Sequence, residues 1–322
     1  MNISDELIEA FGNKINAVRS SEFRAFSNEI PFIERTVAVL DDIQVEVDAN
    51  GGQSLWTITK QMHLTPEVEF FWPATWETTK AELADLLFLV SVYEDQSSPV
   101  EQRTILSQSK FAEQSVSASQ WRYMSRRRKS HRSRFSWKLT PHQYYLLEEL
   151  PEFRVTKPVI DSTYRIDSDQ DSLSTYSFAS DSWLPFFQTT ADMRTPVNYE
   201  WENQTDMAYK RQSHPGGALS LYGYLKQLAK TNRGLSFERY DPIYSFYRDL
   251  FGSNVTLHGT SNPTLTDGGY ETSEFGRPQY FDGSPSERSK PFGIIQIIIR
   301  DGKLLGPDAN FYPDDPLYLG QY

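Results

Sequence analysis

An acid, an amide and a lysine border two apolar runs in the first half of the chain. Asp85 precedes the apolar run 86–92, and Gln108 and Lys110 end a second apolar run. Residues 95–99 between the runs are polar and end on proline, as is typical of a turn. In a β-hairpin the start of one strand lies beside the end of the next, and residues two apart share a face. We therefore expect these three side chains to converge.

These groups suit metal-dependent hydrolysis of a phosphodiester. Asp85 would bind Mg²⁺, with Mn²⁺ as a substitute, and the amide oxygen of Gln108 would be a second ligand, because hard cations accept amide as well as carboxylate oxygens. Lys110 would orient or activate the attacking water and stabilise the charge that builds on the phosphate. A further acid would complete such a site. The candidate acids, in order of preference, are Glu34, then Glu29 and Glu82.

The elements that must position these residues follow from hydrophobic periodicity. Helical spacing predicts a helix over 3–18 and a second over about 31–43, which carries Glu34 in its first turn. Thr140 and Pro141 are typical of a helix start and predict a helix over 140–150. Further expected elements are strands over 54–61, 66–72 and 292–299, helices over 217–231 and 241–251, and a long loop over 258–291.

A basic segment follows the second apolar run. Residues 122–138 contain eight Arg or Lys and no acid, in a chain whose net charge is −11. An acidic protein with one dense basic segment can bind a polyanion locally, and the interleaved aromatic residues suit stacking on bases. A loop without any ligand is the alternative interpretation. The expected DNA-binding residues are Arg122, Arg126, Arg127, Arg128, Lys129, Arg132 and Arg134.

Composition limits the class of protein. The chain has 322 residues, no cysteine and a mean hydropathy of −0.56, which predicts a globular cytoplasmic protein without disulfides. No apolar run approaches the ~20 residues of a membrane span, and the acidic N-terminus does not look like a signal peptide. The GxxxxGK[ST] pattern of P-loop ATPases is absent, so that any ATP hydrolysis would come from a partner.

The pattern Glu82-Leu-Ala-Asp85, apolar strand, turn and Ile105-Leu-Ser-Gln108-Ser-Lys110 resembles the PD-(D/E)XK nuclease superfamily. It is most similar to the branch with Gln-x-Lys, as in Mrr-type restriction endonucleases, and residues 28–150 carry the resemblance. No proline precedes Asp85, and Gln108 stands where an acid is usual. The resemblance implies an α/β fold with a restriction-endonuclease-like core, in which helices flank a mixed β-sheet. We expect this core with its N-terminal helices over 1–160 and a C-terminal α+β elaboration, packed on the core, over 161–322.

The resemblance also implies a function. The expectation is a Mg²⁺-dependent DNA endonuclease in restriction or anti-phage defence, acting away from membranes. Its expected partner is DNA, and a partner ATPase or targeting subunit and a homo-oligomer are compatible with the sequence. Two alternatives remain open. One is a structural or assembly protein, such as a phage particle component, and the other is a nuclease fold that only binds DNA.

Overall fold

The structure is a computed structural model of the whole chain, described over the parts that form its helices, strands and connecting turns. The described residues are 3–22, 29–48, 52–62, 65–94, 98–111, 137–166, 174–179, 186–190, 210–212, 219–230, 233–252, 258–259, 290–302 and 315–319. The helices are α1 (Asp5–Glu22), α2 (Glu29–Leu40), α4 (Pro141–Glu149), α7 (Leu221–Lys230) and α8 (Pro242–Gly252).

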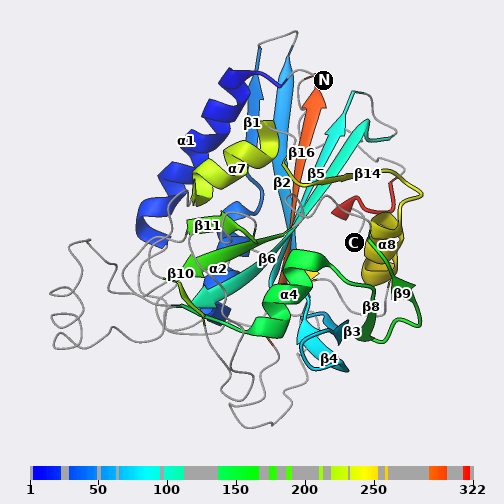
Figure 1. Cartoon of the computed structure of the whole chain (residues 1–322). Helices are drawn as coiled ribbons and strands as arrows, with labels where there is room; N and C mark the ends of the chain where they lie inside the picture. The colour runs from blue at the N-terminus through cyan, green and yellow to red at the C-terminus, as the bar shows by residue number, and fades with distance from the viewer. Residues whose placement is uncertain are drawn as a thin grey trace, which may run out of the picture.

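A mixed β-sheet forms the centre of the described structure (Figure 1). Its main path runs β1-β2-β16-β5-β6-β10-β11-β13, and β14 pairs with β6 and β15 with β2. β16 is parallel to β5 and β10 is parallel to β6, whereas the other pairs are antiparallel. The strands are β1 (Gln44–Val47), β2 (Gln53–Met62), β5 (Leu86–Tyr93), β6 (Glu101–Phe111), β10 (Ser174–Ala179), β11 (Phe186–Thr189), β13 (Leu219–Ser220), β14 (Leu235–Phe237), β15 (His258–Gly259) and β16 (Phe292–Asp301).

Two smaller sheets accompany the central one. The larger of the two has the order β4-β3-β8-β9, and its β3–β4 hairpin leads directly into β5. The other pairs β12 with β7. Their strands are β3 (Glu67–Trp72), β4 (Glu77–Glu82), β7 (Trp137–Leu139), β8 (Phe153–Lys157), β9 (Thr163–Tyr164) and β12 (Lys210–Gln212).

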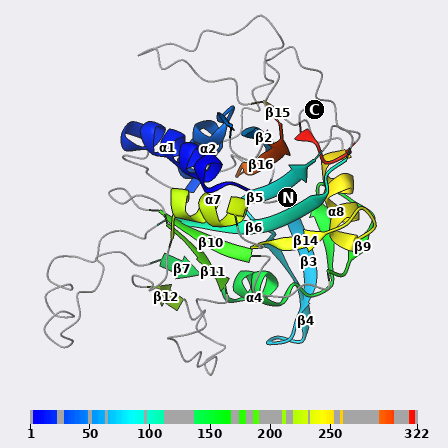
Figure 2. The ribbon, with the colours of Figure 1, turned by 90° about the horizontal axis from the view of Figure 1, so that it is seen from above.

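Helices cover both faces of the central sheet (Figure 2). Leu86 and Phe88 of β5 belong to one hydrophobic core, with side chains of α1, α2 and α7. Leu87 and Leu89 belong to the other, with side chains of α4 and α8. A strand that is covered on both faces is apolar along nearly its whole length, and every residue of β5 is buried. The run 86–92 is accordingly apolar except for Ser91, whose buried hydroxyl accepts a hydrogen bond from Nε2 of Gln296 at 3.1 Å.

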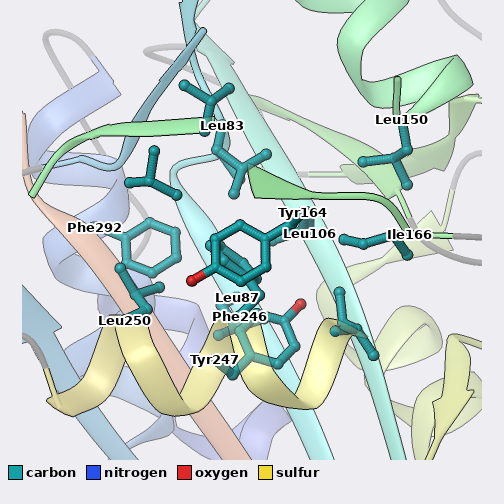
Figure 3. Close-up of a cluster of buried hydrophobic side chains, with 14 of the residues drawn as sticks. Leu83, Leu87, Leu106, Leu150, Tyr164, Ile166, Phe246, Tyr247, Leu250 and Phe292 are labelled. Carbon is teal, nitrogen blue, oxygen red and sulfur yellow. The ribbon is translucent and has the colours of Figure 1, made fainter. Parts of the chain in front are cut away.

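The second of these cores joins distant parts of the chain. Figure 3 shows Leu87 and Leu106 of the central sheet beside Phe246 and Tyr247 of α8 and Phe292 of β16. The ring of Phe246 also meets neighbouring rings edge to face, with centroids 5.2–5.5 Å apart. The C-terminal half of the chain therefore contributes directly to the packing of the β5–β6 hairpin.

The position of β16 also bears on the expected domain boundary. β16 lies between β2 and β5 and pairs with both, and β10, β11 and β13 extend the same sheet beyond β6. Residues 161–322 thus supply four strands of the main path. A boundary at residue 160 would divide strands that share one sheet, so the C-terminal part completes the core instead of only packing on it.

Most predicted elements are confirmed, with small differences at their ends. α1 continues to Glu22 instead of ending at residue 18, and α2 begins at Glu29 instead of about residue 31. α4 begins with Pro141 at its first position, as predicted. The expected long loop 258–291 lies almost entirely outside the described residues. Among the described residues, none of the helices combines the length and the apolarity needed to span a bilayer.

Candidate functional site

The candidate site lies at one end of the central sheet. β5 begins directly after Asp85, and its antiparallel neighbour β6 ends one residue after Lys110. β16 runs parallel to β5, and the backbone N–H of Gly293 donates to the carbonyl oxygen of Asp85 at 2.9 Å. The first residue of α2, Glu29, accepts a hydrogen bond from the backbone N–H of Phe111 at 3.3 Å. This end of the sheet therefore gathers residues that are far apart in the sequence.

Gly293 allows α2 to approach this end of the sheet closely. A Cβ atom at this position would lie 2.4 Å from Val37 Cγ2 and 2.8 Å from Leu86 Cδ2. Real side chains do not pack at such distances, and both neighbours are fully buried. The missing side chain thus lets the helix that begins with Glu29 pack directly on the starts of β5 and β16.

Asp85 is completely buried, and both of its carboxylate oxygens are used. Oδ2 accepts hydrogen bonds from the backbone N–H of Ser109, at 2.6 Å, and from Nε2 of Gln108. Oδ1 lies 2.7 Å from Nζ of Lys290. Burial raises the pKa of Asp85 to about 6, although the Lys290 ammonium and, more weakly, that of Lys110 favour the ionised form. Asp85 thus remains a carboxylate at neutral pH because cations lie beside it.

Lys290, which the sequence analysis did not single out, lies at the centre of the site. Its Nζ is 2.7 Å from Asp85 Oδ1, 2.7 Å from Glu29 Oε2 and 3.3 Å from Glu82 Oε2. We call Glu29, Glu82 and Asp85 the carboxylate trio. Burial by itself would lower the pKa of Lys290, but the carboxylate trio outweighs this effect and raises the pKa above its ordinary value. The ammonium is therefore charged and has one N–H for each carboxylate.

A chain of amides connects Lys110 to Asp85. Nζ of Lys110 donates to Oε1 of Gln143 at 3.0 Å. Nε2 of Gln143 donates to Oε1 of Gln108 at 2.7 Å and to the carbonyl oxygen of Glu82 at 3.2 Å. Lys110 requires an acceptor and the Glu82 carbonyl requires a donor, so these partners fix the orientation of both amides. The Gln108 oxygen, expected to bind metal, therefore faces Gln143, and its nitrogen faces Asp85.

The structure brings together five of the six predicted catalytic and metal-binding residues. Asp85, Gln108 and Lys110 are linked as expected, and Glu29 and Glu82 both reach Lys290. Glu34, the preferred further acid, is exposed instead. Five residues of an α-helix correspond to a rotation of about 140° from Glu29, so Glu34 points away from the carboxylate trio. The sequence prediction started α2 two residues too late, and therefore placed Glu34 instead of Glu29 in the first turn of this helix.

The predicted DNA-binding residues all belong to the basic segment 122–138. Arg122, Arg126, Arg127, Arg128, Lys129, Arg132 and Arg134 all lie outside the described residues. The described chain ends at Phe111 and resumes at Trp137 of β7.

The first turn of α4 supplies two further residues that the sequence analysis did not select. Gln143 is buried and bridges Lys110 to Gln108, as described above. His142 packs edge to face on Trp72, with ring centroids 5.7 Å apart. Burial, and then the nearby Lys110, lower the pKa of His142, so this imidazole is neutral at neutral pH. Their position in the first turn after Pro141 is the sequence signal that could have identified them.

The ligand chemistry of the carboxylate trio fits Mg²⁺, which prefers carboxylate oxygens. The ammonium of Lys290, however, fills the point on which these oxygens converge. Within the described ranges, no group of three or more His, Asp or Glu side chains is arranged so that it could hold a metal ion. A metal ion bound by the carboxylate trio would therefore take the place of the ammonium.

Replacing Gln143 with Leu is expected to lower the free energy of unfolding by about 1–3 kcal/mol, because Gln108 Oε1 and the Glu82 carbonyl would lose their buried donor. Denaturant unfolding followed by circular dichroism would measure the change. Gln44→Leu is the matched control, since Gln44 is exposed on β1. If Gln143→Leu lowers the free energy of unfolding no more than Gln44→Leu does, the bridging role of Gln143 is contradicted.

Comparisons with known proteins gave no relatives. No family model matches the chain, and neither a curated protein nor a solved structure matches it. The side chains at this end of the sheet are therefore the basis for a functional proposal.

Proposed function

We propose that the chain is a metal-dependent endonuclease that hydrolyses DNA phosphodiester bonds and acts in restriction or anti-phage defence. The observation that carries the proposal is the meeting of the carboxylate trio with Lys110 at one end of the sheet. The order of elements also supports it. Along the chain, α2 and β2 come before β5, which begins directly after Asp85. β6, which carries Gln108 and Lys110, comes next, and α4 and β10 follow it. β10 is parallel to β6. This order agrees with the PD-(D/E)XK resemblance.

In this proposal the carboxylate trio holds Mg²⁺ or Mn²⁺, which would polarise the scissile phosphate and favour deprotonation of the attacking water. Lys110 binds a phosphate oxygen and stabilises the charge that develops there. Its hydrogen bond to the neutral amide of Gln143 uses one of its three N–H donors. Gln108 and Gln143 hold Lys110 in a fixed position relative to Asp85.

The charge distribution supports DNA as the substrate. The chain carries a net charge of −11, and the basic segment 122–138 begins 12 residues after Lys110. A segment of this charge attracts the phosphate backbone, whereas the acidic remainder of the chain repels it. The proposal therefore includes DNA contacts by the arginines of this segment.

The test is a cleavage assay with purified chain. Supercoiled plasmid, linear duplex and single-stranded DNA are incubated with Mg²⁺, with Mn²⁺ or with EDTA. We expect cleavage with metal and none with EDTA. Lys110→Gln should reduce the rate at least about 100-fold, the usual effect of removing one group that stabilises developing charge. Lys226→Gln, on the exposed side of α7, should cleave like the parent chain.

The position of Lys290 favours a second candidate, a nuclease fold that binds DNA without cleaving it. If the ammonium of Lys290 always stays at the centre of the carboxylate trio, no metal ion can bind there and the chain cannot cleave DNA by a metal-dependent mechanism. DNA binding without cleavage under any divalent metal would support this candidate and contradict the first. A chain that neither binds nor cleaves DNA would contradict both and favour a structural or assembly role.

A further inference from the structure

Lys290 takes the central position among the side chains that the proposed function assigns to the metal. We propose that Lys290 is an exchangeable internal cation, whose ammonium balances the carboxylate trio in the metal-free protein and is displaced when Mg²⁺ binds. The inference rests on the proposed function only in taking the carboxylate trio as metal ligands. It adds the side chain that controls when the metal binds.

The contacts of Lys290 differ from those of an ordinary surface ion pair. Its side chain is only 15% exposed, and its three N–H donors face three carboxylate oxygens at 2.7–3.3 Å. By contrast, the side chain of Lys157, which pairs with Glu67, is 56% exposed. The enclosed ammonium of Lys290 thus replaces the hydration that its carboxylate partners lose.

Charge balance makes ammonium and metal competitors. Three carboxylates of the trio face two nearby ammonium groups, those of Lys290 and Lys110, so that one negative charge remains. Asp85 is fully buried, and a buried carboxylate without a cation is strongly unfavourable. Any ion that takes the place of Lys290 must therefore supply at least the same charge, which a divalent cation does.

The structure allows the exchange to occur by movement of one side chain. The backbone of Lys290 is fixed, because its carbonyl oxygen accepts hydrogen bonds from the N–H and the hydroxyl of Thr65, at 3.0 and 2.8 Å. Its ammonium is carried on a flexible four-carbon stem. Glu29 and Glu82 are 27% and 41% exposed, so the carboxylate trio opens to solvent on their side. The ammonium can leave and a metal ion can enter there without rearrangement of the sheet.

The test compares metal binding by the parent chain and by Lys290→Gln, with titration calorimetry for Mn²⁺ and Mg²⁺ in the absence of DNA. Lys290→Gln is expected to bind at least about tenfold more tightly, because a unit charge that repels the metal from within a few ångströms is removed. Its melting temperature without metal should fall below that of the parent and rise more steeply as metal is added. Lys157→Gln, which removes an ammonium elsewhere, should bind metal like the parent.

Equal affinity of the parent and of Lys290→Gln would overturn the proposal, as would the absence of binding by Lys290→Gln. If this variant does not fold without metal, folding on addition of Mn²⁺ is the expected result, and a chain that stays unfolded at every Mn²⁺ concentration overturns the proposal. Lys290→Arg keeps the charge and should bind no more tightly than the parent.

The cleavage assay separates failure of this inference from failure of the proposed function. If Lys290→Gln binds metal tightly but no variant cleaves DNA, the exchange of Lys290 for a metal ion is supported and the nuclease function is contradicted. If the parent chain cleaves DNA with metal, and the parent and Lys290→Gln bind metal with equal affinity, the nuclease function is supported and the exchange is contradicted.

Discussion

Asp85→Asn is expected to reduce DNA cleavage at least about 100-fold, the scale on which single electrostatic groups act in active sites. Asp85 is the buried member of the carboxylate trio, and it links this trio to Gln108. Asparagine has nearly the same shape, but it carries no charge and only one acceptor oxygen. Cleavage rates measured over a range of Mg²⁺ concentrations would show the loss.

Asp85→Asn should also lower stability by about 1–3 kcal/mol, because one buried group loses its hydrogen-bonding partner. Oδ2 faces two donors and Oδ1 faces the Lys290 ammonium, so that the amide NH₂ meets a donor in either orientation. Asp249→Asn is the matched control. Asp249 lies on α8 and accepts a hydrogen bond from the Tyr164 hydroxyl at 2.9 Å. The Asp249→Asn variant should cleave DNA at the rate of the parent chain. Full activity of Asp85→Asn would exclude the carboxylate trio as the catalytic site.

Phe88→Ala is expected to lower the free energy of unfolding by about 3–5 kcal/mol, as is usual for a fully buried phenylalanine. The Phe88 ring meets Phe187 and Tyr224 edge to face, with ring centroids 6.1 and 5.3 Å apart. Phe187 and Tyr224 in turn stack on each other at 4.5 Å. Removing one ring leaves a cavity between β5, β11 and α7. Denaturant unfolding followed by tryptophan fluorescence would measure the loss.

The same variant tests whether the two halves of the chain share one core. If they do, amide exchange in β11 and α7 should accelerate together with exchange in β5, because local openings follow cooperative units. Phe71→Ala is the control, since Phe71 is 47% exposed on β3, and it should change stability by less than about 1 kcal/mol. Faster exchange confined to β5 and its direct neighbours in sequence would indicate two independent units.

The β5–β6 hairpin and its polar ends could be predicted from the sequence because their signals are local. The apolar run 86–92, the turn after it and the second apolar run each indicate a strand or a turn within a few residues. Once the runs are paired, antiparallel geometry brings Gln108 beside Asp85. Thr140 and Pro141 likewise predicted the start of α4. Local sequence patterns were therefore sufficient to predict three side chains of the site, those of Asp85, Gln108 and Lys110.

The rest of the site depends on contacts that no local pattern encodes. Lys290 reaches Asp85 only because β16 enters the sheet parallel to β5, 205 residues later in the chain. The apolar run 292–299 indicates a buried strand but does not specify its neighbours. The preference for Glu34 over Glu29 has a smaller cause. The predicted helix began two residues too late, so that Glu29 was left outside the helix and Glu34 was placed in its first turn. Tertiary pairing and exact helix ends are the features that the sequence alone did not provide.

The insertion of β16 has a consequence for the order in which the protein is built. Among the described strands of the main path, β16 is the last to leave the ribosome, yet its place is in the middle of the sheet. Until then β2 and β5 have unpaired edges, which are prone to associate with other chains. The ammonium that balances the carboxylate trio arrives with the same segment. We therefore expect nascent chains that stop before residue 290 to depend on chaperones and to lack a completed site.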